Sequence, residues 1–237
     1  MSEEVLQLCV DRWLPGNSPA ELPEASGHGK LASEFDKWWE PGRTLRVRFL
    51  DGDAGVQTKV VTAAKEWCNH ANINFDFGNH ANAEIRISFF ADDGSWSYIG
   101  KDALEIAKQK PTMNFGWLRP NTAANEVRRV VLHEFGHALG CIHEHQNPAT
   151  KIQWNKPAVY AHYAKQGWNK RDVDFNLFKL YEADSTQFST FDAKSIMLYP
   201  VLKAHTLDGF QVGWNRDLSD LDKEFIGQWY PFDQAKA

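Results

Sequence analysis

The sequence is poor in cysteine and contains no long apolar run. Its three cysteines, Cys9, Cys68 and Cys141, are odd in number and widely spaced, which excludes a disulfide framework as the basis of the fold. No stretch of about 18 apolar residues occurs, so no membrane span is predicted. The formal charge is −5 and basic residues do not cluster, which argues against a nucleic acid as partner.

The N-terminus also lacks the pattern of a cleavable export signal. It reads Met-Ser-Glu-Glu-Val-Leu-Gln-Leu-Cys, without a basic start followed by a long apolar stretch. We therefore expect a protein that stays in the cytoplasm or is exported by a non-classical route. A length of 237 residues suits one domain, or two lobes around a shared site.

One dense motif stands out in the middle of the chain. Residues 133–143 read His-Glu-Phe-Gly-His-Ala-Leu-Gly-Cys-Ile-His, which is the complete HExxHxxGxxH string of zinc proteases. Apolar residues recur at helical spacing across residues 123–140, which predicts a helix. Asn121 or Thr122 is expected to cap its start.

Each fixed position of the string has its own chemical task. His133 and His137 are four residues apart and share one helix face. Gly140 allows the chain to leave the helix sharply, which brings His143 to the same point. Three neutral imidazoles suit one Zn²⁺ per chain and leave a position for water. Glu134 is placed beside the ion, where a general base for a zinc-activated water is needed.

A second string follows downstream. Residues 195–199 read Ser-Ile-Met-Leu-Tyr, and Met197 is the only methionine after the histidines. Metzincins place a methionine turn beneath their zinc, and Met197 is in register for it. The alternative is that Ile196, Met197 and Leu198 are ordinary core residues. After a complete zinc string, the methionine-turn interpretation is favoured.

On these residues the chain resembles the astacin-type metzincins. Residues 191–199, Phe-Asp-Ala-Lys-Ser-Ile-Met-Leu-Tyr, are similar to the family's Tyr-Asp-x-x-Ser-Ile-Met-His-Tyr turn, and residues 94–100 to its Gly-Cys-Trp-Ser-Tyr-Val-Gly strand. The resemblance implies a zinc metalloendopeptidase in which Tyr199 is an additional, swinging zinc ligand that also stabilises the oxyanion. It further implies a peptide or protein substrate bound in extended form along an edge strand near Ser95–Gly100.

Two positions differ from the family pattern, and a third shares it in a different context. Leu198 stands where the family usually has histidine, and Ser95 stands where it usually has a disulfide-bonded cysteine. Glu144 follows the third histidine, as in the family, where that glutamate contacts a processed N-terminus. Here residues 1–41 precede the first expected strand of the catalytic domain.

The expected fold is α+β, a metzincin-type zincin with two lobes. Residues 1–41 are an N-terminal extension or pro-like wrap, and residues 42–237 are the catalytic domain. The upper lobe, about 42–140, should hold a mixed twisted sheet with two long helices. The lower lobe, about 141–237, should be rich in loops and end in a helix. Strands are expected at 45–50, 73–77, 84–90, 95–100 and 112–117, and helices at 56–68, 123–140 and 218–227.

Alternatives remain open at this point. The chain can be a catalytically silent, zinc-containing protein-recognition module, although Glu134 has no task in a pure binder. A thermolysin-like site would need a downstream glutamate ligand, and Glu182 and Glu224 lack the motif. Cys9 can supply a thiolate as a fourth zinc ligand or can simply be buried. The remaining histidines are interpreted as surface or core residues: His28, His70, His80, His145, His162 and His205.

Overall fold

Alternating apolar residues build the sheet of the N-terminal lobe, which we define as residues 42–140. The protein is seen in a computed structural model that describes residues 9, 12, 14, 37–181 and 189–232. In β1, Leu45 and Val47 are fully buried and their neighbours are not, as the alternation predicted. The sheet has the order β2-β1-β3-β5-β4, and β4 is an antiparallel edge on an otherwise parallel sheet. The strands are β1 (Thr44–Phe49), β2 (Asn74–Phe77), β3 (Ile85–Ser88), β4 (Ser95–Ser97) and β5 (Met113–Phe115).

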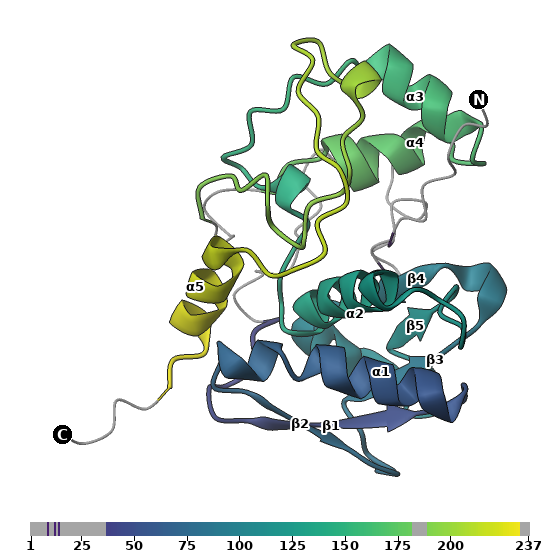
Figure 1. Ribbon diagram of the computed structural model, residues 1–237, viewed down its shortest axis with the longest axis vertical. Helices are drawn as coiled ribbons and strands as arrows, with labels where there is room; N and C mark the ends of the chain where they lie inside the picture. Colours follow the sequence, from purple (N-terminus) through teal and green to yellow (C-terminus); the bar gives the residue numbers. More distant parts are fainter. Residues whose placement is uncertain (1–8, 10–11, 13, 15–36, 182–188, 233–237) are drawn as a thin grey trace.

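Two helices cover the sheet. These are α1 (Ala54–Ala64) and α2 (Ala124–Ala138), which lie next to each other in Figure 1. Asp53 caps α1 by accepting hydrogen bonds from the amides of Gly55 and Val56. The predicted cap of α2 is wrong. Its first flanking residue is Ala123, without a side-chain cap, because the Thr122 hydroxyl instead accepts a hydrogen bond from the Arg119 amide.

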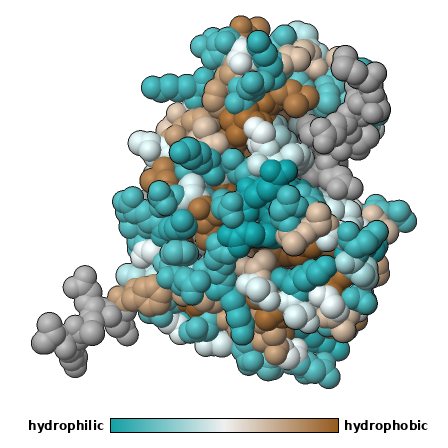
Figure 2. Space-filling view, in the orientation of Figure 1, coloured by the Kyte–Doolittle hydropathy of each residue, from teal (hydrophilic) through white to brown (hydrophobic). Residues whose placement is uncertain are grey.

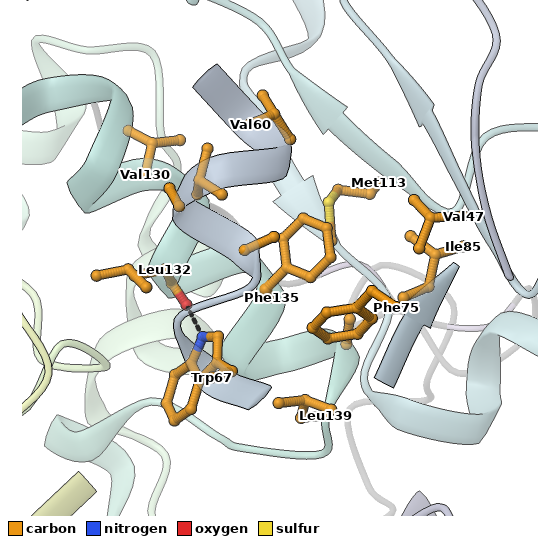
Figure 3. Close-up of a cluster of buried hydrophobic side chains, with 14 of the residues drawn as sticks. Val47, Val60, Trp67, Phe75, Ile85, Met113, Val130, Leu132, Phe135 and Leu139 are labelled. Atoms are coloured by element: carbon orange, nitrogen blue, oxygen red, sulfur yellow. Dashed lines mark hydrogen bonds between the residues drawn. The ribbon is translucent and has the colours of Figure 1, made fainter. Parts of the chain in front are cut away.

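The core between sheet and helices is aromatic and aliphatic (Figure 3). Phe135 of α2 meets Phe75 of β2 edge to face, with ring centroids 5.0 Å apart. Trp67 is buried, and its indole N–H donates to the Leu132 carbonyl at 3.0 Å. Each such large side chain contributes roughly 1.5–3 kcal/mol through burial, so the helix that carries the histidines is held rigidly.

The C-terminal lobe, residues 141–232, has its own smaller core. Val159 and Tyr163 of α3 (Lys156–Ala164) pack with Val173 and Leu177 of the next helical segment, and Tyr199 completes this cluster. That segment is α4 (Lys170–Val173), which continues into a π-helical turn, η6 (Asp174–Phe178). The sequence predicted only loops and a final helix here. Short helices show too few turns for their periodicity to be recognised.

The final helix is α5 (Asp220–Trp229), which agrees with the expected 218–227. Single 3₁₀ turns make up the rest of the described elements: η2 (Trp67–Asn69), η3 (Ala91–Asp93), η4 (Gly100–Glu105), η5 (Glu144–Gln146) and η7 (Lys203–His205). The strand expected at 95–100 stops at Ser97, because Ile99 leads into η4. The predicted α+β class with a mixed sheet and two long helices is confirmed.

The face seen in Figure 2 is mainly hydrophilic, with apolar residues in separate patches. Among the described residues, no helix combines the length and the apolar character that a bilayer crossing requires. The predicted boundary between residues 41 and 42 stays a prediction.

Candidate metal centre

The helix α2 and the turn after it bring three histidines to one point. His133 and His137 project from one face of α2, one helical turn apart. Gly140 has a φ of 105°, and the Cys141 amide donates back to the Gly136 carbonyl at 2.9 Å. A side chain at Gly140 would lie 3.1 Å from the Trp38 ring. Only glycine allows this exit from the helix without strain.

The three imidazoles converge through the same ring nitrogen. The Nε2 atoms of His133, His137 and His143 lie 3.2 Å from one another in each pairing. The Nδ1 atom of His133 is 2.8 Å from the Ile196 carbonyl, and that of His137 is 2.9 Å from the Cys141 carbonyl. A carbonyl can only accept, so in both rings Nδ1 carries the proton and Nε2 presents a lone pair. The lone pairs of both rings therefore face a common point.

This point fits a zinc ion. With zinc–nitrogen distances of about 2.0–2.1 Å, tetrahedral ligands lie roughly 3.3 Å apart, close to the observed spacing. All three side chains are buried, with exposed fractions of 3%, 1% and 0%. Burial, and then the neighbouring imidazoles, lower the pKa of His133 well below its usual value, which keeps the ring neutral as a ligand must be. Among the described residues these histidines are the group arranged to hold a metal.

Glu134 lies next to the histidines, as the string predicted. Its carboxylate is fully buried. Cys9 reaches the same place from the N-terminal extension, and its buried thiol lies against the Glu134 carboxylate. Burial, followed by the charge of Glu134, raises the pKa of Cys9 well above its usual value, so the thiol is neutral. The contact of Cys9 is thus with the carboxylate beside the metal-ligating group.

Tyr199 packs against the site from the core of the C-terminal lobe. Its ring lies 4.3 Å from the ring of His143 and 4.5 Å from the ring of His145. Its hydroxyl donates a hydrogen bond to the Cys9 carbonyl. His145 is fully buried, and its Nε2 atom is 2.8 Å from the Asn176 carbonyl. From the sequence, His145 was interpreted only as a surface or core residue. Its spacing from the ligands does not reveal that its ring packs against Tyr199.

The methionine turn lies directly under α2. A Cβ added at Gly136 would stand 2.5 Å from the Met197 sulfur, so the helix and the turn touch where Gly136 has no side chain. Asp222 of α5 holds this turn in place. It accepts from the Ser195 hydroxyl at 2.7 Å and from the Ile196 amide at 2.8 Å. The Ile196 carbonyl is the partner of His133, so Asp222 is linked to a ligand through one residue.

Asp192, which lies shortly before the methionine turn in sequence, has a local task. It accepts from the Lys194 amide at 2.8 Å, as a turn-forming aspartate does. Its own amide donates to Glu144, which is largely buried. Burial raises the pKa of Glu144 to about 8. Glu144 lines a pocket together with Trp38, Asp222 and Phe225, and none of the three histidines lines that pocket.

The edge strand β4 lies near the same site. Its Ser95 hydroxyl accepts a hydrogen bond from the Gly116 amide at 3.1 Å, which ties the edge to its own sheet. On its outer side Ser95 forms an isolated parallel bridge with Cys9. The strand expected to bind extended substrate is thus the one against which the N-terminal extension pairs.

Comparisons with known proteins agree with this geometry. Residues 32–230 match the family profile described as Astacin, a family of peptidases. A curated relative, "Zinc metalloproteinase nas-36" of Haemonchus contortus, is 24% identical over 227 residues. The match covers 91% of this chain and 34% of that relative, so the chain spans about a third of its length.

Solved structures extend the likeness to three dimensions. A structure of myroilysin has 46% identity and a TM-score of 0.82, covering 84% of this chain and 97% of that one. A crystal structure of myroilysin has 41% identity and a TM-score of 0.69, covering 95% and 91%. High choriolytic enzyme 1, a hatching enzyme zinc-protease from Oryzias latipes (Medaka fish), has 16% identity and a TM-score of 0.56, covering 82% and 94%. This third likeness is one of fold alone.

Proposed function

The chain belongs to the astacin family of zinc metalloendopeptidases, and from this premise we propose that Glu134 and Tyr199 carry out peptide-bond hydrolysis at the three-histidine centre. The observation that supports the proposal is the convergence of His133, His137 and His143 beside a fully buried carboxylate. The bound zinc ion supplies Lewis acidity, which makes water a better nucleophile and polarises the scissile carbonyl.

Glu134 is the proposed general base. It follows His133 directly on α2, so its carboxylate lies beside the metal position and outside the ligand set. From there it takes a proton from the attacking water and later passes a proton to the leaving amine. Its burial in a rigid helix keeps the carboxylate in one place, which proton transfer requires.

Tyr199 is the proposed stabiliser of the oxyanion and an additional zinc ligand. Its hydroxyl already donates to a main-chain carbonyl, that of Cys9. A substrate carbonyl in the same place would receive the same hydrogen bond as negative charge develops on its oxygen. The packing of the ring against both His143 and His145 supports this position of the hydroxyl.

The proposed substrate is a peptide or protein segment that adds itself to β4 in extended form. The edge strand β4 is the last strand of the sheet, and main-chain hydrogen bonds to such an edge accept many sequences. The pairing of β4 with Cys9 supports the proposal, because a further segment of chain already bonds the outer side of this strand.

The first test is Glu134→Gln. This change removes the base and keeps the size of the side chain, so zinc content should stay at one ion per chain while cleavage of casein or gelatin falls by at least about a hundredfold. Glu105→Gln, an exposed change of the same kind, is the control. A chelator should abolish wild-type cleavage. Near-normal cleavage by Glu134→Gln would remove Glu134 from its role.

The same assay separates the peptidase from a silent zinc-containing recognition module. A wild-type chain that holds one zinc ion and cleaves no protein or peptide in any form, with or without its N-terminal extension engaged, would be such a module. The intact carboxylate beside the ligands favours the peptidase.

We also propose that the N-terminal extension, residues 1–41, restrains the enzyme. A single residue, Cys9, contacts both proposed catalytic groups: its thiol lies against Glu134 and its carbonyl accepts a hydrogen bond from Tyr199. Cys9 also pairs with Ser95 of β4, where substrate is proposed to bind. The proposed restraint is thus a segment of chain that covers the base with a neutral thiol. In the alternative, Cys9 would bind the metal as a thiolate. Among the described residues, the group that could hold a metal consists of the three histidines without Cys9.

The restraint is tested in the full chain by Cys9→Ala. Removing the thiol frees Glu134, so kcat/KM for a peptide substrate should rise several-fold while zinc content stays constant. Cys68→Ala, which alters a cysteine elsewhere in the N-terminal lobe, should leave kcat/KM as it was. Equal rates for Cys9→Ala and the unaltered chain would show that Cys9 does not restrain the site.

A further inference from the structure

A second residue of the N-terminal extension is bound on β4, beyond Cys9. The Arg12 guanidinium forms an ion pair with Asp93, directly before β4. It also lies over the ring of Trp96, 4.5 Å from the centroid. Asp93 therefore neutralises the charge of the guanidinium, and the Trp96 ring packs against its flat face. Such a pair of contacts is the usual way in which proteins recognise arginine.

The groups that receive Arg12 are held in place by the protein itself. The Trp96 indole N–H donates to the second oxygen of Asp93 at 2.9 Å, which leaves the first oxygen for the guanidinium. Tyr98 meets Trp96 edge to face, with ring centroids 5.8 Å apart. Trp96 is only 5% exposed. The carboxylate and the ring thus form a prearranged receptor, and the Arg12 side chain, about two-fifths exposed, is its occupant.

The receptor lies within reach of the proposed catalytic groups. Cys9 touches Glu134 and Tyr199, and Arg12 is three residues further along. Three extended residues span at most about 10–11 Å. A peptide that replaces the extension on β4 therefore brings one of its side chains to Asp93 and Trp96 when its scissile bond is at the metal centre.

We propose that Asp93, Trp96 and Tyr98 form a substrate subsite for an arginine side chain, and that Arg12 occupies it in the restrained chain. The proposal rests on the peptidase function proposed above and adds a substrate class to it. Peptides with arginine at one position within about four residues of the cleaved bond are preferred. Lysine is a poorer occupant, because an ammonium lacks the flat face that stacks on the indole.

The test uses paired fluorogenic peptides that carry arginine or its neutral isostere citrulline at each position in turn. The enzyme is the zinc-loaded full chain with Cys9→Ala and Arg12→Ala, which frees the base and the subsite. At one position, kcat/KM for arginine should exceed that for citrulline about three- to tenfold, as expected for one ion pair and one cation–π contact. Asp93→Asn should bring this ratio to about one.

The matched control is Asp92→Asn. Asp92 and Asp93 are consecutive in the same exposed turn, η3, so both changes remove one negative charge at this edge. The arginine preference should survive in Asp92→Asn. Absence of a preference at every position would overturn the subsite, as would an equal ratio in Asp93→Asn and Asp92→Asn.

A binding measurement separates failure of the subsite from failure of the proposed function. In the same chain carrying Glu134→Gln, calorimetry should give tighter binding of the arginine peptide than of the citrulline peptide, by a similar factor. If no peptide is cleaved but this difference in Kd appears and depends on Asp93, the subsite stands and the hydrolytic function fails. If peptides are cleaved and the two Kd values agree, the subsite fails alone.

Discussion

At the scale of the residue, Tyr199 has the most direct consequence for catalysis. Its hydroxyl donates to the main-chain carbonyl of Cys9, while its ring packs against His143 and His145. Tyr199→Phe keeps the ring and removes the donor. We expect kcat to fall about a hundred- to a thousandfold with zinc content unchanged. Stopped assays and metal analysis on the same preparation check this. An unchanged kcat would return Tyr199 to a packing role.

Gly136 is the residue at which the zinc helix and the methionine turn touch. In most helices Gly→Ala stabilises by up to about 1 kcal/mol, but here the new Cβ meets the buried Met197 sulfur at 2.5 Å. We expect Gly136→Ala to destabilise by about 1–3 kcal/mol, a fall in Tm of several degrees. Gly213→Ala, at a position with nothing within 4 Å, is the control. A Tm for Gly136→Ala at or above that of the wild type would contradict the tight contact.

At the scale of the element, α5 supports the metal centre from the far side of the methionine turn. Asp222 accepts from Ser195 and Ile196 of the turn, and Ile196 accepts from His133. Asp222→Asn replaces one acceptor oxygen by a donor, so the turn loosens and His133 loses its orientation. We expect the Kd for zinc to rise about 10–100-fold, measured by competition with a chelating dye.

The control for this prediction lies in the same helix. The Ser219 hydroxyl caps α5 by accepting from the Asp222 amide at 2.9 Å, whereas the Asp222 carboxylate is the group that bonds the methionine turn. Ser219→Ala should therefore lower stability by about 1 kcal/mol and keep the zinc affinity. Equal zinc affinities for Asp222→Asn and Ser219→Ala would show that Asp222 supports the helix and not the ligand.

Elements differ in how far the sequence predicts them. The ligand string in α2 was predictable, because helical geometry alone brings His133 and His137 together and Gly140 turns the chain toward His143. The edge position of β4 is likewise confirmed. Asp222 was not recognised as a support of the turn, since contacts across more than twenty residues leave no local spacing. Asp192 is close to the turn in sequence, but its carboxylate accepts from the nearby Lys194 amide.

At the scale of the whole molecule, acid should weaken the C-terminal lobe. His205 is 2% exposed, and burial, followed by the nearby His162, lowers its pKa to about 4. The unfolded chain binds this proton below about pH 6.5, whereas the folded chain does so only near pH 4. Between these values the unfolded state holds more protons. Stability therefore falls as the pH is lowered through this window, by up to about 1.4 kcal/mol per unit.

Urea unfolding with chelator present, between pH 4 and pH 7, measures this loss. His205→Gln should show a shallower decline in the free energy of unfolding than the unaltered chain, because its unfolded state no longer binds a proton at position 205. His70→Gln, which changes a partly exposed histidine of the other lobe, should retain the full decline. Parallel declines for His205→Gln and the unaltered chain would contradict the buried neutral histidine.

The joint arrangement of the N-terminal extension and the catalytic domain was the hardest feature to predict. The sequence offered Cys9 either as a metal ligand or as a buried residue. Cys9 is buried, as the second alternative held, and its contact with Glu134 was not predicted. The receptor for Arg12 depends on Asp93 and Trp96 lying on the same side of an edge, which only the folded sheet decides. Long-range pairings of this kind carry no periodicity in the sequence.

The end of the described chain closes the structure around the zinc helix. The Tyr230 hydroxyl donates to the Leu139 carbonyl at 2.7 Å and accepts from the Trp39 amide at 3.2 Å. On a ribosome, α2 emerges about ninety residues before Tyr230 and well before Asp222. The helix that carries two of the histidines is therefore synthesised well before the residues that fix its end and support the methionine turn.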